Sequence, residues 1–173
     1  MVTQYYTGSS IDGFIADPEH SLSWLVTRDI DPDGPQAYDA FIAEVGAMCM
    51  GANTYQWLLD NAPDDWSYQV PCWVVTHRTF PESEHDIRFT SMGVPELHAA
   101  MSEAAGGRNL WIIGGGDLVG QFHDHGLLDE VWVQYAPVTL GGGAPLLPRR
   151  IELELVETDR NRDFVCARYR VAR

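Results

Sequence analysis

The sequence predicts one α/β domain over residues 1–173, with a mostly parallel sheet covered by helices on both faces and a C-terminal antiparallel hairpin. Between residues 35 and 137, strand-like apolar runs alternate with segments of helical periodicity, which is typical of a parallel sheet. Residues 110–113 are apolar at every position, as expected of a strand buried on both faces. Residues 151–157 and 164–171 alternate instead, and the short polar stretch between them predicts the hairpin.

The composition is that of an acidic globular protein. The 173 residues are 45% hydrophobic and 21% charged, and the formal net charge is -14. Such a chain is repelled by nucleic acid and by anionic membranes, so we expect neither as a partner, and a small molecule instead. Cys49, Cys72 and Cys166 are widely spaced, which favours neither disulfides nor a metal site. With no leader-like start and no long apolar run, a cytoplasmic protein is expected.

A strand and a tight turn are predicted at the N-terminal end. Residues 2–7 are β-branched and aromatic and form the strand, which ends at Gly8. Asp12 begins an Asp-Gly turn that leads into a short extended segment, residues 14–16. Asp12 either satisfies its own turn or takes part in chemistry, and the sequence leaves both open.

A long loop and a helix come next. Residues 17–34 are rich in Asp, Pro and Ser, and a loop of this length that contains Trp24 and Leu25 predicts a lid that folds onto a ligand. Apolar residues at helical spacing predict a helix over residues 35–45. Residues 47–50 form a second buried strand.

Gly51 ends the second strand and leads into another helix. Asn53 or Thr54 either caps this helix or helps its N-terminus to hold a phosphate group. A polar turn around residues 63–65 then precedes the third strand, residues 72–76.

Polar side chains follow the third strand at its carboxyl end, where open α/β sheets place ligand contacts. Thr76, His77 and Arg78 are therefore ligand candidates, although Arg78 could equally be a solvated surface residue. A weak strand over residues 87–90 and a helix over residues 94–105 lead to the next buried strand.

The strand at residues 110–113 ends in three consecutive glycines, and the chain re-enters as a helix that runs to about residue 125. Such a transition brings backbone N–H groups and a helix N-terminus to one point, and it removes every Cβ there. It predicts a ligand site, most often for a nucleotide; a plain tight turn is the alternative.

The last strand before the hairpin covers residues 130–137. Gln134 within it is either partnered in the core or directed at a pocket. The second glycine-rich loop, residues 139–145, is followed by no helical pattern, so the phosphate-loop argument does not extend to it.

These segments resemble the dihydrofolate-reductase-like superfamily over essentially the whole chain. The resemblance rests on residues 2–16, Met50-Gly51-Ala52-Asn53-Thr54-Tyr55, residues 74–78, Ile113-Gly114-Gly115-Gly116 and residues 127–131. The Ser10-Ile11-Asp12-Gly13 turn, Trp24 and the loop at residues 140–146 are similar to the riboflavin-biosynthesis reductase branch, the RibD C-terminal domain. The resemblance implies a three-layer fold with about eight strands and an NADPH site across the sheet.

Site residues are implied by the same resemblance. In that family the peptide between the first two glycines is cis, which corresponds here to Gly114–Gly115. Residues expected to hold the cofactor are Gly51, Asn53, Thr54, Thr76, His77, Arg78, Gly114, Gly115, Gly116, Asp117, Leu118, Val119 and Gln121. Residues expected to border the substrate are Tyr5, Trp24 and Gln134, and those considered for proton transfer are Asp12, Asp39, Tyr5 and a bound water.

Three departures from the family pattern are visible. Ala52 stands where members often carry an arginine, and Asp117 places a carboxylate at a helix start where some relatives have a base. Folate reductases also need a carboxylate at the start of the helix after the lid, and the nearest acids here are Asp33 and Asp39, in poor register. A reductase of a heteroaromatic or ribosylamino-pyrimidine-like substrate is therefore favoured over a pterin or dihydrofolate reductase. A nucleotide-binding module without turnover is the third hypothesis, and a homodimer is expected because relatives pair through strand edges.

Overall fold

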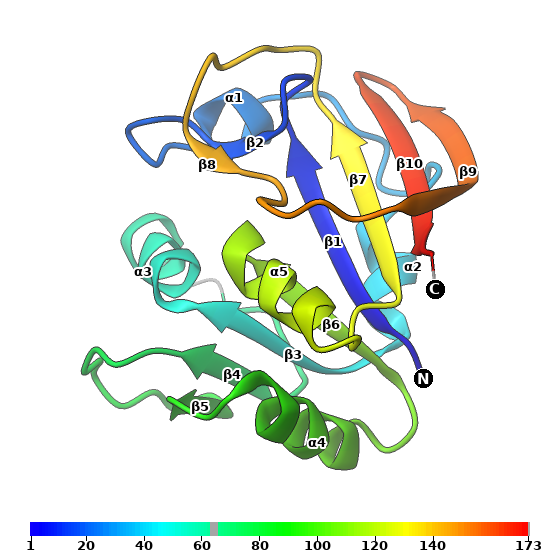
Figure 1. Ribbon diagram of the computed structural model, residues 1–173. Coiled ribbons are helices and arrows are strands. Elements are labelled where there is room, and N and C mark those ends of the chain that lie inside the picture. Colours follow the sequence, from blue (N-terminus) through cyan, green and yellow to red (C-terminus); the bar gives the residue numbers. More distant parts are fainter. Residues whose placement is uncertain (63–65, 173) are drawn as a thin grey trace.

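The computed structural model describes residues 1–62 and 66–172 and shows the predicted α/β architecture (Figure 1). Eight strands form the main sheet: β1 (Thr3–Ser9), β3 (Val45–Gly51), β4 (Cys72–Val75), β5 (Ile87–Thr90), β6 (Asn109–Gly114), β7 (Glu130–Tyr135), β9 (Leu153–Asn161) and β10 (Phe164–Val171). Their order is β5-β4-β3-β6-β1-β7-β10-β9. The pairings from β5 to β7 are parallel, and β10 is antiparallel to both β7 and β9.

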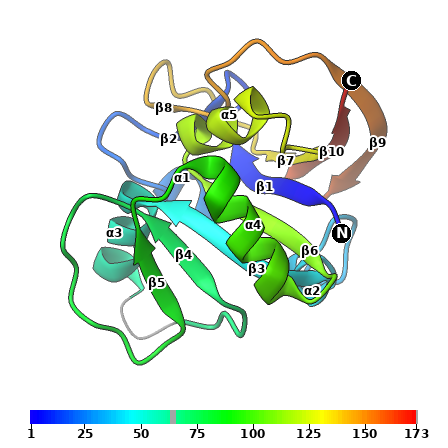
Figure 2. The same cartoon turned by 60° about the horizontal axis from the view of Figure 1, so that its bottom comes forward.

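Helices cover both faces of this sheet. α4 (Val94–Ala105) and α5 (Gly116–Asp124) lie in front of it in Figure 1, and α2 (Tyr38–Ala43) lies behind. α3 (Ala52–Asn61) packs on the same face as α2, because Tyr55 of α3 and Phe41 of α2 belong to one apolar cluster. Figure 2 shows α4 and α5 together on the other side of the strands. The predicted three layers are confirmed.

The burial of β6 under helices on both faces of the sheet explains why its sequence has no polar face. Leu110 and Ile112 are fully buried against α4 and α5, whereas Trp111 between them packs against the α2 side. Successive side chains of a strand point to opposite faces, so a strand covered on both sides must be apolar throughout. The central strand thus joins the two halves of the core.

The predicted lid is an ordered loop that is tied to the C-terminal hairpin. It contains α1 (Ser23–Val26) and begins after β2 (Phe14–Ala16), which pairs with β8 (Ala144–Pro145) in a separate two-stranded sheet. Asn161 at the end of β9 accepts the Asp31 N–H at 2.8 Å and donates to the Asp31 carbonyl at 3.0 Å. Arg162 pairs with Asp29 at 2.7 Å. The second half of the loop therefore has a fixed base.

Several boundaries differ from those expected. The helix predicted from residue 35 begins at Tyr38, because Gln36 has a φ of 53°, in the left-handed region that a helix excludes. The hairpin turn is shorter than expected, since β9 continues to Asn161. The turn expected around residues 63–65 lies outside the described residues. No helix of the described residues is long and apolar enough to cross a membrane.

Candidate active site

A cavity of about 1070 Å³ opens at the carboxyl ends of the parallel strands. Because β1, β3, β4 and β6 run in the same direction, their carboxyl ends meet at one edge of the sheet. Strand residues that line the cavity include Gly8 of β1, Gly51 of β3, Val75 of β4 and Gly114 of β6. The first half of the lid forms the opposite wall, where the Leu25 side chain packs directly on the Gly8 backbone.

Two helices begin at this cavity without a capping side chain. Gly51 is the N-cap of α3 and Gly115 is the N-cap of α5, and neither offers a side-chain oxygen to the first N–H groups of its helix. The first turns, including Asn53, Thr54 and Leu118, line the cavity. Unpaired N–H groups and the positive ends of two helix dipoles therefore face the same space, and this arrangement suits a ligand with two linked phosphates.

The three glycines of the β6–α5 turn have different roles. The Gly114–Gly115 peptide is cis, as the resemblance implied, and Gly114 has a φ of 147°, which favours glycine. A Cβ on Gly115 would meet no atom within 4 Å, so this position leaves the cavity open. A Cβ on Gly116 would collide with the carbonyl oxygens of Pro145 and Leu146. The third glycine therefore allows the loop after β8 to pack on α5.

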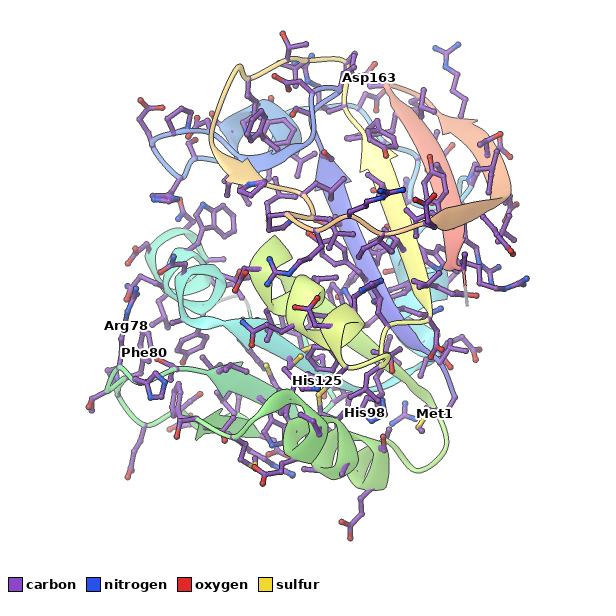
Figure 3. The ribbon with its side chains drawn as sticks, in the orientation of Figure 1. Met1, Arg78, Phe80, His98, His125 and Asp163 are labelled. Atoms are coloured by element: carbon purple, nitrogen blue, oxygen red, sulfur yellow. The ribbon has the colours of Figure 1, made fainter. Side chains whose placement is uncertain are left out.

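Arg78 links the loop after β4 to the start of α3. Its Nη2 donates to Asn53 Oδ1 at 2.8 Å, and its backbone N–H donates to Thr76 Oγ1 at 2.8 Å. Figure 3 shows Arg78 beside Phe80 at the α3 side of the molecule. Arg78 lines the cavity, whereas Thr76 and His77 do not. Thr76 shapes the loop instead, and the arginine is the cation available to a phosphate group at this end.

Asp117 at the start of α5 lines the cavity but does not carry a free charge. Its Oδ1 is 3.0 Å from Arg149 Nη2, and its Oδ2 accepts a hydrogen bond from Gln121 Nε2 at 2.9 Å. The hydrogen bond from Gln121 and the pairing with Arg149 hold the pKa of Asp117 below its ordinary value. Arg149 also pairs with Asp124 at 3.1 Å and lies along α5 over Gly120. The Asp117 carboxylate, which would otherwise repel a phosphate group, is therefore offset by an arginine.

Ten of the thirteen residues expected to bind the cofactor line the cavity: Gly51, Asn53, Thr54, Arg78, Gly114, Gly115, Gly116, Asp117, Leu118 and Gln121. Besides Thr76 and His77, the exception is Val119, which is fully buried in the core between α5 and α4. Its neighbour Leu118 faces the cavity instead, because adjacent residues of a helix point in different directions.

Neither acid considered for catalysis lies at the cavity. The Asp12 carboxylate accepts hydrogen bonds from the Ser10 hydroxyl at 2.7 Å and from the Gly141 N–H at 2.7 Å, and it also accepts the Leu140 N–H. These hydrogen bonds, led by that of Ser10, lower the pKa of Asp12 to about 2. Asp12 thus holds two loops together as a turn residue. Asp39 is exposed in the first turn of α2 and is not among the lining residues.

The residues expected at the substrate are shifted from their predicted places. Tyr5 is fully buried on the α4 and α5 side, where desolvation raises its pKa, and the adjacent Tyr6 lines the cavity instead. The Trp24 side chain packs against the small core at Ala136, away from the cavity. Gln134 is buried and donates to the Gln36 carbonyl at 3.0 Å, so its core interpretation is the one the structure supports.

Several residues that line the cavity were missed by the sequence interpretation. Lid residues such as His20 and Leu22 line it, together with Trp57 of α3 and the aromatic rings of Tyr68 and Trp111. Trp57 could have been noticed, because a tryptophan outside the apolar stripe of an amphipathic helix needs a partner beyond the core. The lid contacts depend on how the loop folds back, and no local pattern signals that.

The comparison with known families agrees with this geometry. The RibD C-terminal domain model matches residues 66–162, more than half of the chain. The chain belongs to the RibD C-terminal domain family. The matched residues include the glycine turn, α5 and the loop that carries Arg78, so the match covers seven of the ten lining residues that were expected to bind the cofactor.

Related proteins support the assignment to the RibD C-terminal domain. The uncharacterized protein YwjB of Bacillus subtilis is 29% identical over 144 residues, covering 83% of this chain and 81% of YwjB. A solved structure from Shewanella sp. PV-4, named for riboflavin biosynthesis, is 26% identical, with a TM-score of 0.85 and 100% of both chains covered. Enterococcus faecalis dihydrofolate reductase, solved with NADP(H), has a TM-score of 0.65 at 12% identity, covering 99% of this chain and 97% of the reductase. The chain is a RibD C-terminal reductase-like domain with a dihydrofolate-reductase-like fold.

Proposed function

We propose that this protein is an NADPH-dependent reductase of a small heteroaromatic or ribosylamino-pyrimidine-like substrate. The observation that carries the proposal is one cavity whose lining combines two chemically different groups of residues, which we assign to two ends. At one end, the uncapped starts of α3 and α5 and the Arg78 guanidinium suit the phosphates of a dinucleotide. At the other end, aromatic and lid side chains suit a planar ring.

Bound NADPH would supply a hydride from C4 of its nicotinamide to the carbon of a C=N or C=O bond, and it would leave as NADP⁺. The protein aligns the two reactants and excludes water around them. The cradle for the cofactor is formed by Gly51 and Gly115: a Cβ on Gly115 would meet no atom within 4 Å, and one on Gly51 would make only ordinary contacts at 3.8 Å. The new N–H or O–H needs one proton, and of the candidates considered from the sequence we retain a single bound water, since Asp12, Asp39 and Tyr5 do not line the cavity.

The first experiment measures NADPH and NADH binding by fluorescence titration in the wild type and in Arg78→Ala. We expect the wild type to prefer NADPH and the variant to lose that preference, because Arg78 would no longer pair with the 2′-phosphate. Arg88→Ala is the matched control, since Arg88 pairs with Asp86 outside the cavity and should leave both affinities unchanged. Absence of binding by either nucleotide at millimolar concentration would refute the reductase proposal.

Binding without turnover is the second candidate function. It is favoured because Asp12 and Asp39 do not line the cavity, so neither of these two acids is positioned to donate a proton to the substrate. Substrate-dependent oxidation of NADPH, followed at 340 nm, separates the two functions. A pterin or dihydrofolate reductase is less well supported, because no residue of α2 lines the cavity, and that helix would have to supply the carboxylate.

We also propose that the chain forms a homodimer through the edge strand β9. Its residues from Leu153 to Arg160 are exposed, and Leu155 and Val165 of the neighbouring strand expose 61% and 56% of their surfaces. The unpaired backbone of an edge strand can pair with a second chain, and exposed apolar side chains such as these favour such a contact. Light scattering with size exclusion should give a dimer for the wild type and a monomer for Leu155→Glu.

A further inference from the structure

We infer that the substrate carries no phosphate or carboxylate group and is a neutral or cationic planar heterocycle. This inference rests on the proposed function, because it assigns one end of the cavity to the cofactor. It separates this chain from a reductase of phosphoribosylated pyrimidines and from a reductase of glutamate-bearing folates. It follows from where the basic side chains of the chain are used.

All eleven basic side chains of the sequence are arginines, and the chain has no lysine. Within residues 1–62 and 66–172, Arg78 is the only arginine that lines the cavity. Six others are paired with acidic side chains: Arg88, Arg149, Arg150, Arg162, Arg168 and Arg170. Arg28 is in the lid, but its Nε donates to the Trp24 carbonyl at 3.0 Å, and neither residue lines the cavity.

The Arg78 guanidinium belongs to the cofactor end. It bonds to Asn53 in the first turn of α3, beside the helix starts that would receive the pyrophosphate. A 2′-phosphate held there would use this charge, and no other arginine among the described residues lines the cavity to receive a second anion. The adjacent pair at residues 149 and 150, which could have served a substrate phosphate, is committed to Asp117, Asp124 and Glu152.

The remaining charged side chains at the cavity are carboxylates. Glu19 of the lid and Asp60 in the last turn of α3 line it, besides Asp117, whose charge is offset by Arg149. The His20 side chain also lines the cavity and is exposed at the lid surface. An anionic group here would lose its hydration without gaining a counter-charge, which is strongly unfavourable. The net charge of -14 adds long-range repulsion of anions.

The substrate end instead offers flat apolar surface. Tyr6, Trp57, Tyr68 and Trp111 contribute aromatic rings, and Leu22 adds an aliphatic contact from the lid. Aromatic side chains bind planar rings through their faces and edges without requiring charge. A neutral ring is compatible with every described side chain at this end, and a cationic ring gains from the nearby carboxylates.

The test uses matched ligand pairs that differ only in the anionic group, with protein preloaded with NADPH. One pair is 5-amino-6-ribosylaminouracil and its 5′-phosphate, and a second is dihydrofolate with its two glutamate carboxylates converted to amides and dihydrofolate itself. Tryptophan quenching gives the dissociation constants, and NADPH oxidation gives kcat/KM where turnover occurs. We expect the member without the anion to bind at least tenfold more tightly in both pairs.

A charge-reversal variant makes the test specific to the cavity. Asp60→Arg should shift the preference at least fivefold toward the anionic member, since it places a cation in the last turn of α3 at the cavity wall. Glu103→Arg makes the same charge change in the last turn of α4, outside the lining, and should leave the preference unchanged.

Equal binding of the two members, tighter binding of the anionic members, or binding by neither pair would overturn the inference. An anion preference that disappears in Arg28→Ala would show that lid closure brings this arginine to the substrate. A failure of the proposed function is recognised separately, because NADPH itself would then not bind to the wild type.

Discussion

Replacing Gly51 by alanine tests the phosphate cradle without removing any polar group. Gly51 ends β3, caps α3 and lines the cavity. Its φ of -81° and ψ of 164° are accessible to alanine. A Cβ would contact only the Gly114 carbonyl oxygen and the Gly115 nitrogen, both at 3.8 Å. The new methyl group should therefore fit the folded protein but occupy space that the cofactor needs.

The two expected effects of Gly51→Ala differ in size. Loss of a glycine N-cap costs up to about 1 kcal/mol, and the lower entropy of the unfolded chain returns about 0.4–1 kcal/mol. The free energy of unfolding should thus change by less than about 1 kcal/mol, or roughly 2–4 °C in Tm. Crowding by one methyl group in a close-packed contact costs about 1–3 kcal/mol, so the Kd for NADPH should rise about 5- to 100-fold.

Gly93→Ala provides the matched control. Gly93 is also an N-cap glycine with extended backbone, at the start of α4, and its Cβ would come no closer than 3.9 Å to Pro95. It does not line the cavity, so the Kd for NADPH should stay at the wild-type value. Urea denaturation and fluorescence titration of the three proteins are the assays. Wild-type affinity in folded Gly51→Ala would refute the assignment of this cradle to the cofactor.

Three further substitutions test the charges described above. In Asp12→Asn, the two loops lose a carboxylate acceptor whose pKa is lowered from 3.8 to about 2. Wild-type stability should therefore exceed that of the variant above pH 4, and the difference in Tm should vanish as the pH falls to 2. A difference in Tm that stays constant with pH would contradict the role of the Asp12 carboxylate in holding the loops together. In Glu130→Gln, a buried carboxylate is lost, and Arg168, which lies 2.7 Å away and is 30% exposed, loses its charged partner. Urea denaturation should show that the free energy of unfolding falls by about 2 kcal/mol or more. A fall under about 0.5 kcal/mol would argue against a stabilising ion pair. In Arg149→Ala, Asp117 loses its ion-pair partner, and its negative charge should weaken NADPH binding a few-fold at low salt. Adding Asp117→Asn should restore the affinity. No recovery in the double variant would mean that Arg149 acts in another way.

The residues that line the cavity at the starts of α3 and α5 could be predicted from the sequence because their determinants are local. A buried strand, a glycine and the first turn of a helix are contiguous, so Gly51–Thr54 and Gly114–Leu118 indicate their position without knowledge of the fold. Arg78 follows the same rule, since it stands just past the carboxyl end of a strand. Val119 lies outside the cavity lining because the rotation of the helix turns it into the core.

The substrate side depends on register and on long-range packing. Tyr5 and Tyr6 are adjacent in a strand covered on both faces, and no alternation in the sequence tells which of them faces the cavity. Trp24 was expected at the cavity because it is a large apolar residue in a loop, yet it is the neighbouring Leu22 and Leu25 that line the wall. The pairing of Asp117 could not be seen in the sequence, because its partner Arg149 lies 32 residues away along the chain.

The contact of Asn161 with the lid base has a consequence for exchanging loops between relatives. Its amide group occupies the space where a Cβ on Gly34 would stand, and Asn161 also binds the carbonyl groups of Asp31 and Pro35. The base of the lid and the hairpin turn therefore have to be exchanged together, although about 130 residues separate them in the chain. A chimera that takes residues 17–36 from a homologue should keep its lid geometry only when residues 159–164 come from the same parent.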